Sequence, residues 1–363
     1  MIVTPAAASP VRVAAFGAAD AAPPMAAWRT LAAQGDDRNP FWEPAFALPA
    51  ATLPGVAPPL FVACWRGERM TALLALERPR LGAASPLLRA WSHDQAVLGA
   101  PLLDPLHGAE DIGVALRWLQ SRHRLAGALL WRWMPEDGPA AAALAAAGAR
   151  PVRLDAHERA ALANASPLPV KKRKELGRLR RRLAEQGRLE SVSAAAPDDV
   201  ETACTAFAAL EARGWKGRRG SAFASHPDRL RFLQAVTQGL ARDGGCRIDR
   251  LTLDGETIAA GVLLGGGPRA LYWKTTYDER FAAFSPGVLL TVDVTDRQLA
   301  DSSVRLTDSC AVAHHPMIDR LWAGRVRVSD WWIPLGPTST AMLATERARR
   351  ALRATAKRML GRG

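Results

Sequence analysis

Side chains capable of chemistry gather in one stretch in the second half of the 363-residue chain. The stretch opens with YWKTTYDER, residues 272–280, which includes a lysine and two tyrosines. It continues through a Ser-Pro-Gly turn at residues 285–287 and reaches Asp308 and His315. A cation, hydroxyl groups, a carboxylate and an imidazole so close along the chain favour a catalytic role for this half.

The Ser-Pro-Gly turn predicts the start of a helix, because serine is a good N-cap and proline suits the first helical position. A helix start leaves several backbone N–H groups unpaired, and a glycine there lets a bulky anion approach the backbone. The turn is therefore a candidate diphosphate site, although an ordinary capped helix explains the same residues. The residues expected to hold the anion are Ser285, Pro286, Gly287, Val288 and Leu289.

Three residues are candidates for proton transfer: Asp308, Tyr277 and His315. Asp308 follows a predicted strand, Val304–Thr307, and could act as a base or orient the acceptor. His315 could take a proton, and Tyr277 could protonate a leaving thiolate. Plainer interpretations stay open, because adjacent histidines such as His314 and His315 are more often turn residues, and a strand tyrosine usually packs in the core.

Lysine is rare, with six lysines against 42 arginines. Four of the lysines lie in two basic segments, and the other two are Lys216 and Lys274. Where arginine is the default cation, a lysine could be kept for its compact charge. Lys216 also lies beside Trp215 in a glycine-rich loop. We therefore expect Trp215, Lys216 and Lys274 to contact an anionic substrate, with chance as the alternative.

Several common active-site signatures are missing from the sequence. There is no Walker A loop, no G-x-G-x-x-G that opens a helix after a strand, no H-E-x-x-H and no G-x-S-x-G. The four cysteines are far apart and form no Cys-x-x-Cys pair, which argues against a metal site or a disulfide framework. Cys310 has no acidic or oxyanion pattern beside it and is interpreted as a buried cysteine.

The sequence favours a cytoplasmic protein. The sequence contains no run of about 18 apolar residues, so no transmembrane helix is expected. Residues 1–10 lack the charged and apolar regions of a signal peptide. We therefore expect the protein to be in the cytoplasm, with peripheral contact with the inner membrane as a further possibility.

The net charge of +13 comes from two segments. Residues 171–188 hold nine Lys or Arg against two Glu, and residues 344–363 hold seven against one, so the two together carry the whole excess. Both segments predict basic amphipathic helices. Such helices suit tRNA or an anionic membrane surface as a partner, or they are simply solvated helix faces.

A weak internal repeat predicts two domains. Leu60–Leu76 and Ile248–Leu264 each read as a strand, a tight turn with Gly and Glu, and a second strand. Each is followed by a third strand, a helix and a further strand, and the long period favours duplicated domains over a solenoid. Chance similarity of two hairpins is the alternative. The predicted divisions are 1–160 and 191–340 for the two domains, 161–190 for a basic connecting helix and 341–363 for a basic C-terminal helix.

Residues 165–335 resemble the CelD-like acetyltransferases, a branch of the GNAT superfamily named after cellulose-biosynthesis loci. The resemblance rests, in order, on KKRKELGRLRRRLAEQG, LEARGWKGRRGSAF, LDGETIAAGVLL, YWKTTYDERFAAFSPGVLL and DSCAVAHHPMIDRLW. More loosely, the whole chain is similar to the double-GNAT arrangement of the Fem-type aminoacyl transferases. The implied fold class is α+β, a three-layer α/β arrangement of two tandem GNAT-like domains with mixed, mostly antiparallel sheets flanked by helices.

The resemblance also implies an acyl-thioester donor, usually acetyl-CoA or another acyl-CoA, which the acceptor attacks directly. The donor's diphosphate would lie at residues 285–289, and its thioester between splayed strands near 274–276 and 304–308. One departure from the common GNAT pattern is that the Q/R-x-x-G-x-G/A diphosphate loop is missing and Ser-Pro-Gly stands in its place.

These observations together predict an acyl-CoA-dependent N- or O-acyltransferase that acts on a small molecule or a polysaccharide precursor. A Fem-like transferase that takes an aminoacyl group from tRNA is the first alternative. A non-catalytic scaffold in exopolysaccharide biosynthesis is the second.

Overall fold

The computed structural model describes residues 10–22, 24–35, 38–163 and 168–359. Residues 164–167 of the predicted connecting segment and residues 360–363 of the predicted C-terminal helix lie outside this part. The chain divides into two compact units that are not consecutive stretches of sequence. Unit 1 comprises Met1–Gly35, Ala57–Ala156 and Val328–Gly363, and unit 2 comprises Asp36–Val56 and His157–Arg327.

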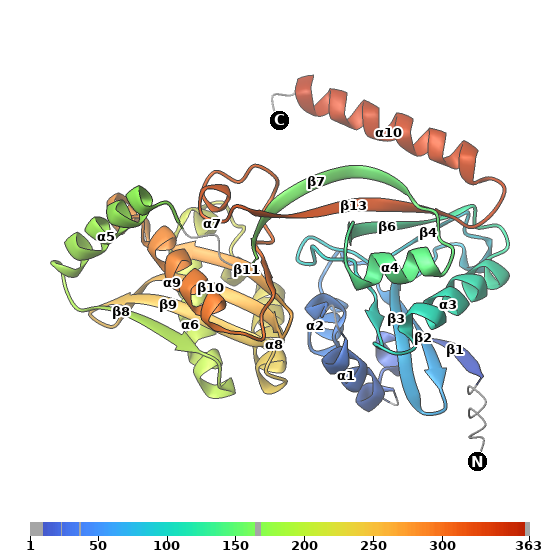
Figure 1. Ribbon diagram of the computed structural model, residues 1–363, viewed down its shortest axis with the longest axis horizontal. Coiled ribbons are helices and arrows are strands. Elements are labelled where there is room, and N and C mark those ends of the chain that lie inside the picture. Colours follow the sequence, from blue (N-terminus) through green and yellow to red (C-terminus); the bar gives the residue numbers. More distant parts are fainter. Residues whose placement is uncertain (1–9, 23, 36–37, 164–167, 360–363) are drawn as a thin grey trace, which may run out of the picture. The chain divides into compact units, whose positions relative to one another are not determined.

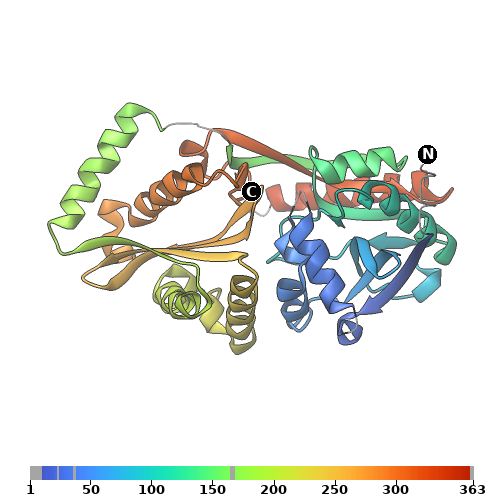
Figure 2. The ribbon, with the colours of Figure 1, turned by 60° about the horizontal axis from the view of Figure 1, so that its bottom comes forward.

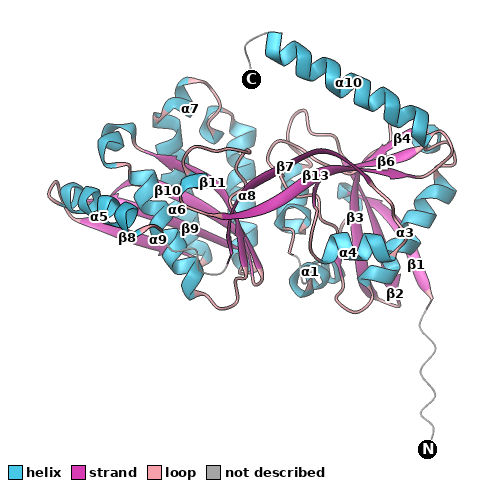
Figure 3. Cartoon of the chain, turned by 45° about the horizontal axis from the view of Figure 1, so that its top comes forward, coloured by secondary structure: helices cyan, strands magenta, loops and turns pink. Residues whose placement is uncertain are grey.

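Unit 1 contains a four-stranded antiparallel sheet of order β1-β2-β3-β5 among the described residues. Helices α1 and α3 pack on this sheet (Figure 3). The elements are β1 (Val11–Gly17), α1 (Met25–Gln34), β2 (Pro59–Arg66), β3 (Arg69–Glu77), β5 (Leu102–Leu103) and α3 (Gly108–Arg122).

A second group of strands in unit 1 carries the C-terminal helix. Strand β6 pairs in parallel with β4 and antiparallel with β13. Trp332 of β13 is buried in a small core against which Met342 and Leu343 of α10 pack. The elements are β4 (Leu87–Arg89), β6 (Ala128–Pro135), α4 (Pro139–Ala146), β13 (Gly324–Pro334) and α10 (Ser339–Met359).

Unit 2 is built on a sheet with the strand order β7-β12-β11-β10-β9-β8 (Figure 1). All neighbouring strands whose register is known are antiparallel except β11 and β12, which are parallel. The strands are β7 (Val152–Ala163), β8 (Leu189–Ala194), β9 (Cys246–Leu253), β10 (Glu256–Gly266), β11 (Arg269–Tyr277) and β12 (Leu306–Asp308). The helices are α2 (Pro44–Ala50), α5 (Val170–Ala184), α6 (Pro197–Arg213), α7 (Trp215–Arg218), α8 (Pro227–Arg242) and α9 (Pro286–Ala300).

Helices cover both faces of the unit 2 sheet. Figure 2 shows α6 and α8 on one face and α5 and α9 on the other. Two consecutive residues of β11 confirm the division, because successive strand residues point to opposite faces. Tyr272 packs in the core under α9, whereas the Trp273 ring lies 6.3 Å from the ring of Phe232 on α8. The predicted fold class, mixed and mostly antiparallel sheets flanked by helices, is confirmed.

The two units repeat the same order of elements. Each begins with a strand and helices, continues with two antiparallel strands and a third strand, and ends with a helix and a strand parallel to the third one. In unit 1 the parallel pair is β4 and β6; in unit 2 it is β11 and β12. The repeat predicted from two hairpins therefore includes the third strand, the helix and the parallel strand of each unit, whereas β5 and α4 of unit 1 have no counterpart in unit 2.

The units exchange one strand each. Strand β7 follows β6 of unit 1 in sequence, but its second half pairs with β12 of unit 2. Strand β13 follows β12, and its second half pairs with β6 of unit 1. Each exchanged strand occupies the same position, antiparallel to the last strand of the repeat.

Local sequence signals placed most elements well. The two predicted hairpins are β2–β3 and β9–β10, and the second turns at Asp254 and Gly255, which both have positive φ as a tight hairpin turn requires. The basic segments form α5 and α10. One prediction was wrong: Asp308 does not follow a strand but is the last residue of β12. In the described part of the chain, every helix is too short or too polar to cross a bilayer.

The C-terminal helix contains a carboxylate, Glu346, whose charge is strongly stabilised by arginines of the same helix. Glu346 accepts hydrogen bonds from Arg349 and from the Nε of Arg350, the latter at 2.7 Å, and Arg350 also lies 3.0 Å from Asp330 of β13. The hydrogen bonds from Arg349, followed by those from Arg350, lower the pKa of Glu346 from 4.5 to about 2. Because this pKa is depressed in the folded state, its stabilisation is present above pH 4.5 and is lost as the pH falls toward 2.

We predict that Glu346→Gln lowers the free energy of unfolding at pH 6 and has a progressively smaller effect below pH 4.5. Urea unfolding of both proteins at pH 6 and pH 3.5 measures the difference. A constant difference at both pH values contradicts the assignment, because only the ionised carboxylate interacts favourably with the two arginines.

Candidate active site

Strands β11 and β12 pair over a short length and then separate. The parallel pairing runs from Arg269 and Leu306 to Leu271 and Asp308. Beyond this point residues 272–277 of β11 and residues 309–311 after β12 line a cavity of about 500 Å³. The volume is in the range of small-molecule sites.

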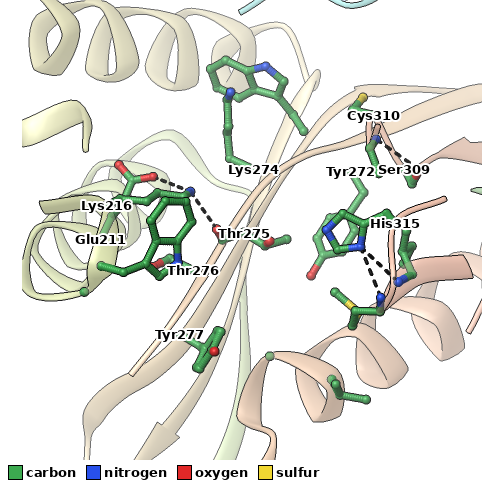
Figure 4. Close-up of a pocket in the computed structure, with 18 of the residues that line it drawn as sticks. Glu211, Lys216, Tyr272, Lys274, Thr275, Thr276, Tyr277, Ser309, Cys310 and His315 are labelled. Carbon is green, nitrogen blue, oxygen red and sulfur yellow. Dashed lines mark hydrogen bonds and ion pairs between the residues drawn. The ribbon is translucent and has the colours of Figure 1, made fainter. Parts of the chain in front are cut away.

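The cavity is lined from both faces of the sheet. Glu211 of α6 and Lys216 of α7 contribute from one side, and Gly287 and Val288 of α9 from the other. In Figure 4, Lys216 and Glu211 lie on one side of β11, and Tyr272 and His315 lie on the other. The cavity therefore lies where the strands separate and is lined by elements from both faces of the sheet.

A β-bulge in β11 determines the direction in which the side chains of the cavity wall point. Val262 of β10 pairs with Lys274, whereas the next residue of β10 pairs with Tyr272, so Trp273 is the extra residue. A bulge lets two neighbouring side chains point to the same side. The Lys274 ammonium accordingly lies 5.1 Å from the ring centroid of Trp273, a cation–π contact on the α8 side.

Lys216 is held in a fixed position beside the cavity. Its Nζ donates to Oε1 of Glu211 at 2.7 Å and to the carbonyl oxygen of Thr275 at 3.2 Å. The second oxygen of Glu211 accepts the N–H of Phe223. This buried carboxylate ties α6 and α7 to β11 through Lys216. Trp215 forms the outer wall with a 45 % exposed side chain.

The start of α9 presents fewer N–H groups than the sequence predicts. Ser285 is the N-cap in a left-handed conformation with φ 53°, and Pro286 has no N–H. The N–H groups of Val288 and Leu289 both donate to the carbonyl oxygen of Ser285. Of the predicted anion-binding residues, Ser285, Gly287 and Val288 line the cavity, whereas Pro286 and Leu289 are buried. Gly287 is therefore the residue that offers a backbone donor there.

Tyr277 and His315 both line the cavity. The Tyr277 side chain is 40 % exposed and lies against the start of α9, 3.4 Å from where a Cβ of Gly287 would be. His315 accepts N–H groups of Met317 and Ile318 at its Nδ1, so the neutral ring carries its proton on Nε2. In this tautomer the Nε2–H of His315 can donate a hydrogen bond to a ligand.

Asp308 lies behind the cavity wall. It is fully buried, and its Oδ2 accepts from Arg159 of β7 at 2.7 Å, where Arg159 is 1 % exposed. Its Oδ1 accepts the N–H of Cys310, which has a positive φ of 54° and lines the cavity. Burial, with a further contribution from Asp308, raises the pKa of the Cys310 thiol, so this cysteine stays protonated and is a poor nucleophile.

The structure thus brings Trp215, Lys216, Lys274, Tyr277 and His315 to one cavity and leaves Asp308 outside it. Sequence reasoning missed Arg159 and Glu211. Glu211 carried a signal, since it is a carboxylate one helical turn after the buried Phe207 on the apolar face of α6. Arg159 carried none that the sequence alone makes visible.

The residues before the corresponding helix in unit 1 form a turn around Asp104. Oδ1 of Asp104 accepts the N–H groups of Leu106 and His107, which precede α3, at 3.0 Å each. The other carboxylate oxygen pairs with Arg69. The helix itself begins at Gly108, and its N-cap residue, His107, makes no side-chain capping bond.

Comparison with known sequences finds a family match within unit 2. Residues 170–311 match the family described as Acetyltransferase (GNAT) domain. This segment is similar to a GNAT acetyltransferase domain. The matched range runs from α5 to the turn after β12 and does not include β7, the strand that supplies Arg159. No curated protein shows significant sequence similarity to the chain.

Solved structures share the fold at low sequence identity. The C-terminal domain (DUF2156) of a putative lysylphosphatidylglycerol synthetase from Agrobacterium fabrum has a TM-score of 0.55 and 11 % identity, covering 90 % of this chain and 96 % of that one. A conserved protein of unknown function from Bacteroides thetaiotaomicron has a TM-score of 0.50 and 11 % identity, covering 85 % and 97 %. A tandem GNAT protein from the clavulanic acid biosynthesis pathway has 19 % identity and covers 90 % and 99 %, with a TM-score of 0.40. At these identities the first two likenesses concern the fold alone.

We predict that Arg159→Met lowers the free energy of unfolding by about 3–5 kcal/mol, the usual cost of removing one partner of a buried ion pair. Asp308 would be left charged, without its cationic partner. Adding Asp308→Asn removes that charge and keeps an oxygen for the Cys310 N–H, so the double variant is expected to be more stable than Arg159→Met. Urea unfolding measures both. A double variant no more stable than the single one contradicts the importance of the pair.

Proposed function

We propose that the protein is an acyl-CoA-dependent acyltransferase whose single active site is the cavity in unit 2. The main support is the cavity where β11 and β12 separate, which is lined from both faces of the sheet. In this proposal the donor and the acceptor approach from opposite faces, and their reacting atoms meet in the cavity. The resemblance to CelD-like acetyltransferases belongs to this proposal.

The donor is assigned to the α9 face. The Gly287 N–H and the positive end of the α9 dipole favour a phosphate group there, and glycine leaves room for it beside Tyr277. The acceptor is assigned to the face of α6 and α7, where Trp215 provides an aromatic wall and the Lys216–Glu211 pair fixes the mouth. Lys274 contributes positive charge on the same face.

The acyl group transfers directly in this proposal. The lone pair of an acceptor amine or hydroxyl attacks the thioester carbonyl carbon, the C–S bond breaks, and Tyr277 protonates the departing thiolate. The Nε2–H of His315 is assigned to the oxygen on which negative charge develops. The nucleophile's proton passes to water, because both oxygens of Glu211 are already hydrogen-bonded. Asp308 positions the wall through Cys310 and does not exchange protons.

Because the donor is assigned to one face of the cavity, substitutions on the two faces should affect donor binding differently. Acetyl-CoA at 100 times its Kd should stabilise the native protein by about 2.7 kcal/mol and raise Tm by about 5 °C or more. Gly287→Val should abolish the increase, because the added methyl groups fill the space between α9 and Tyr277. Trp215→Ala, on the other face, should keep the increase. Differential scanning fluorimetry measures all three proteins.

Two outcomes would count against this assignment. If neither acetyl-CoA nor longer acyl-CoAs up to millimolar concentration shift Tm of the native protein, the donor is not an acyl-CoA. If both variants lose the shift, the donor does not bind on one face only.

The single active site proposed in unit 2 predicts a stoichiometry of one. Titration of the protein with acetyl-CoA by calorimetry should give one molecule per chain, because the proposed donor site lies in unit 2 alone. Gly287→Val should reduce the stoichiometry to zero. A value of two in the native protein would show a second donor site and contradict the proposal of a single one.

A further inference from the structure

Helix α5 is anchored on unit 2 by one face. Leu176 and Leu183 are buried in the core that α9 also covers. Arg180 donates two hydrogen bonds to Asp293 of α9, at 2.7 and 3.0 Å. The helix is therefore a fixed part of the unit, and its outer face has a defined surface.

The outer face carries a stripe of four exposed cations, Lys171, Lys174, Arg178 and Arg181. Their spacing of three, four and three residues places them along one side of the helix, over a length of about 15 Å at 1.5 Å per residue. In the described part of the chain, none of these four has a carboxylate within ion-pair distance. Their charges are available to a partner.

The stripe borders a hollow of about 760 Å³. The four cations and Arg173 line it, and its remaining lining is Leu168, Val170 and Gly177, with no carboxylate. Gly177 lies in the middle of the helix, where glycine is unfavourable compared with alanine. A Cβ atom added at Gly177 would have only Nη1 of Arg181 within 4 Å. The absence of a side chain at this position therefore deepens the hollow.

We propose that this basic groove, residues 168–181 of α5 and its N-terminal approach, binds a single strand of nucleic acid through its phosphates. A line of four cations is longer than one phosphate group needs and matches a repeating anion. The shallow apolar floor gives room for sugar and base groups between the phosphates.

A membrane surface fits the groove less well. Helices that bind lipid insert apolar side chains among the acyl chains, but Leu176 and Leu183 point into the core and Val170 is the exposed large apolar residue of α5. The proposal is independent of the acyl-transfer reaction, since none of these residues lines the cavity in the sheet.

The experiment measures fluorescence anisotropy of a labelled 15-nucleotide oligouridylate with the full-length protein at several NaCl concentrations. Four phosphate contacts on a single strand predict that log K falls with log[NaCl] with a slope of about −2.8. The double variant Arg178→Gln/Arg181→Gln should bind at least tenfold more weakly, with a slope nearer −1.4.

A matched control separates the groove from net charge. Arg231→Gln/Arg242→Gln removes the same charge from exposed positions on α8 and should bind like the native protein. Thermal unfolding of each variant verifies that it is folded. Equal weakening by both double variants overturns the proposal, as does full displacement of the oligonucleotide by phosphatidylglycerol vesicles, or by inorganic phosphate at matched ionic strength.

Discussion

The ion pair between Arg159 and Asp308 joins the parts of unit 2 on which the cavity depends. Both side chains are almost completely buried, and charges in such surroundings are tolerated only when they are paired and hydrogen-bonded. Arg159 lies on the exchanged strand β7, and Asp308 ends the short strand β12. The second oxygen of Asp308 holds the N–H of Cys310, where the backbone turns through a left-handed conformation. The pair therefore secures the strand exchange and the cavity wall together.

Whereas the ion pair joins parts of the unit, the short length of β12 opens a gap in the sheet. A strand of three residues pairs with only the first part of β11, so residues 272–277 pair with β10 alone. The bulge at Trp273 then turns Lys274 toward α8, while Tyr272 remains under α9. At these two irregularities the sheet holds a cavity lined from both faces. Lys216, bonded to the carbonyl oxygen of Thr275, stabilises the free part of β11.

The two units show how one order of elements supports different roles. In unit 2 the helix after the third strand begins at Ser-Pro-Gly and faces a cavity. In unit 1 the corresponding helix begins at Gly108, after a turn in which the Asp104 carboxylate accepts the N–H groups of Leu106 and His107 and pairs with Arg69. The two helix starts therefore differ in the few residues that precede them.

The sequence by itself determined the local elements and the residues of the cavity's longest wall. Turn residues and apolar periodicity predicted both hairpins, and the Pro-Asp-Asp start placed α6 at Pro197–Arg213, because these signals act over a few neighbouring residues. Only the tertiary structure decided which strands pair. The pattern of β7 is the same whichever unit it joins, so the exchange could not be predicted. Arg159 and Asp308 are 149 residues apart, and only the folded chain brings them together as a buried ion pair. The bonding of the Val288 and Leu289 N–H groups to Ser285 likewise depends on the left-handed turn, which no residue type alone reveals.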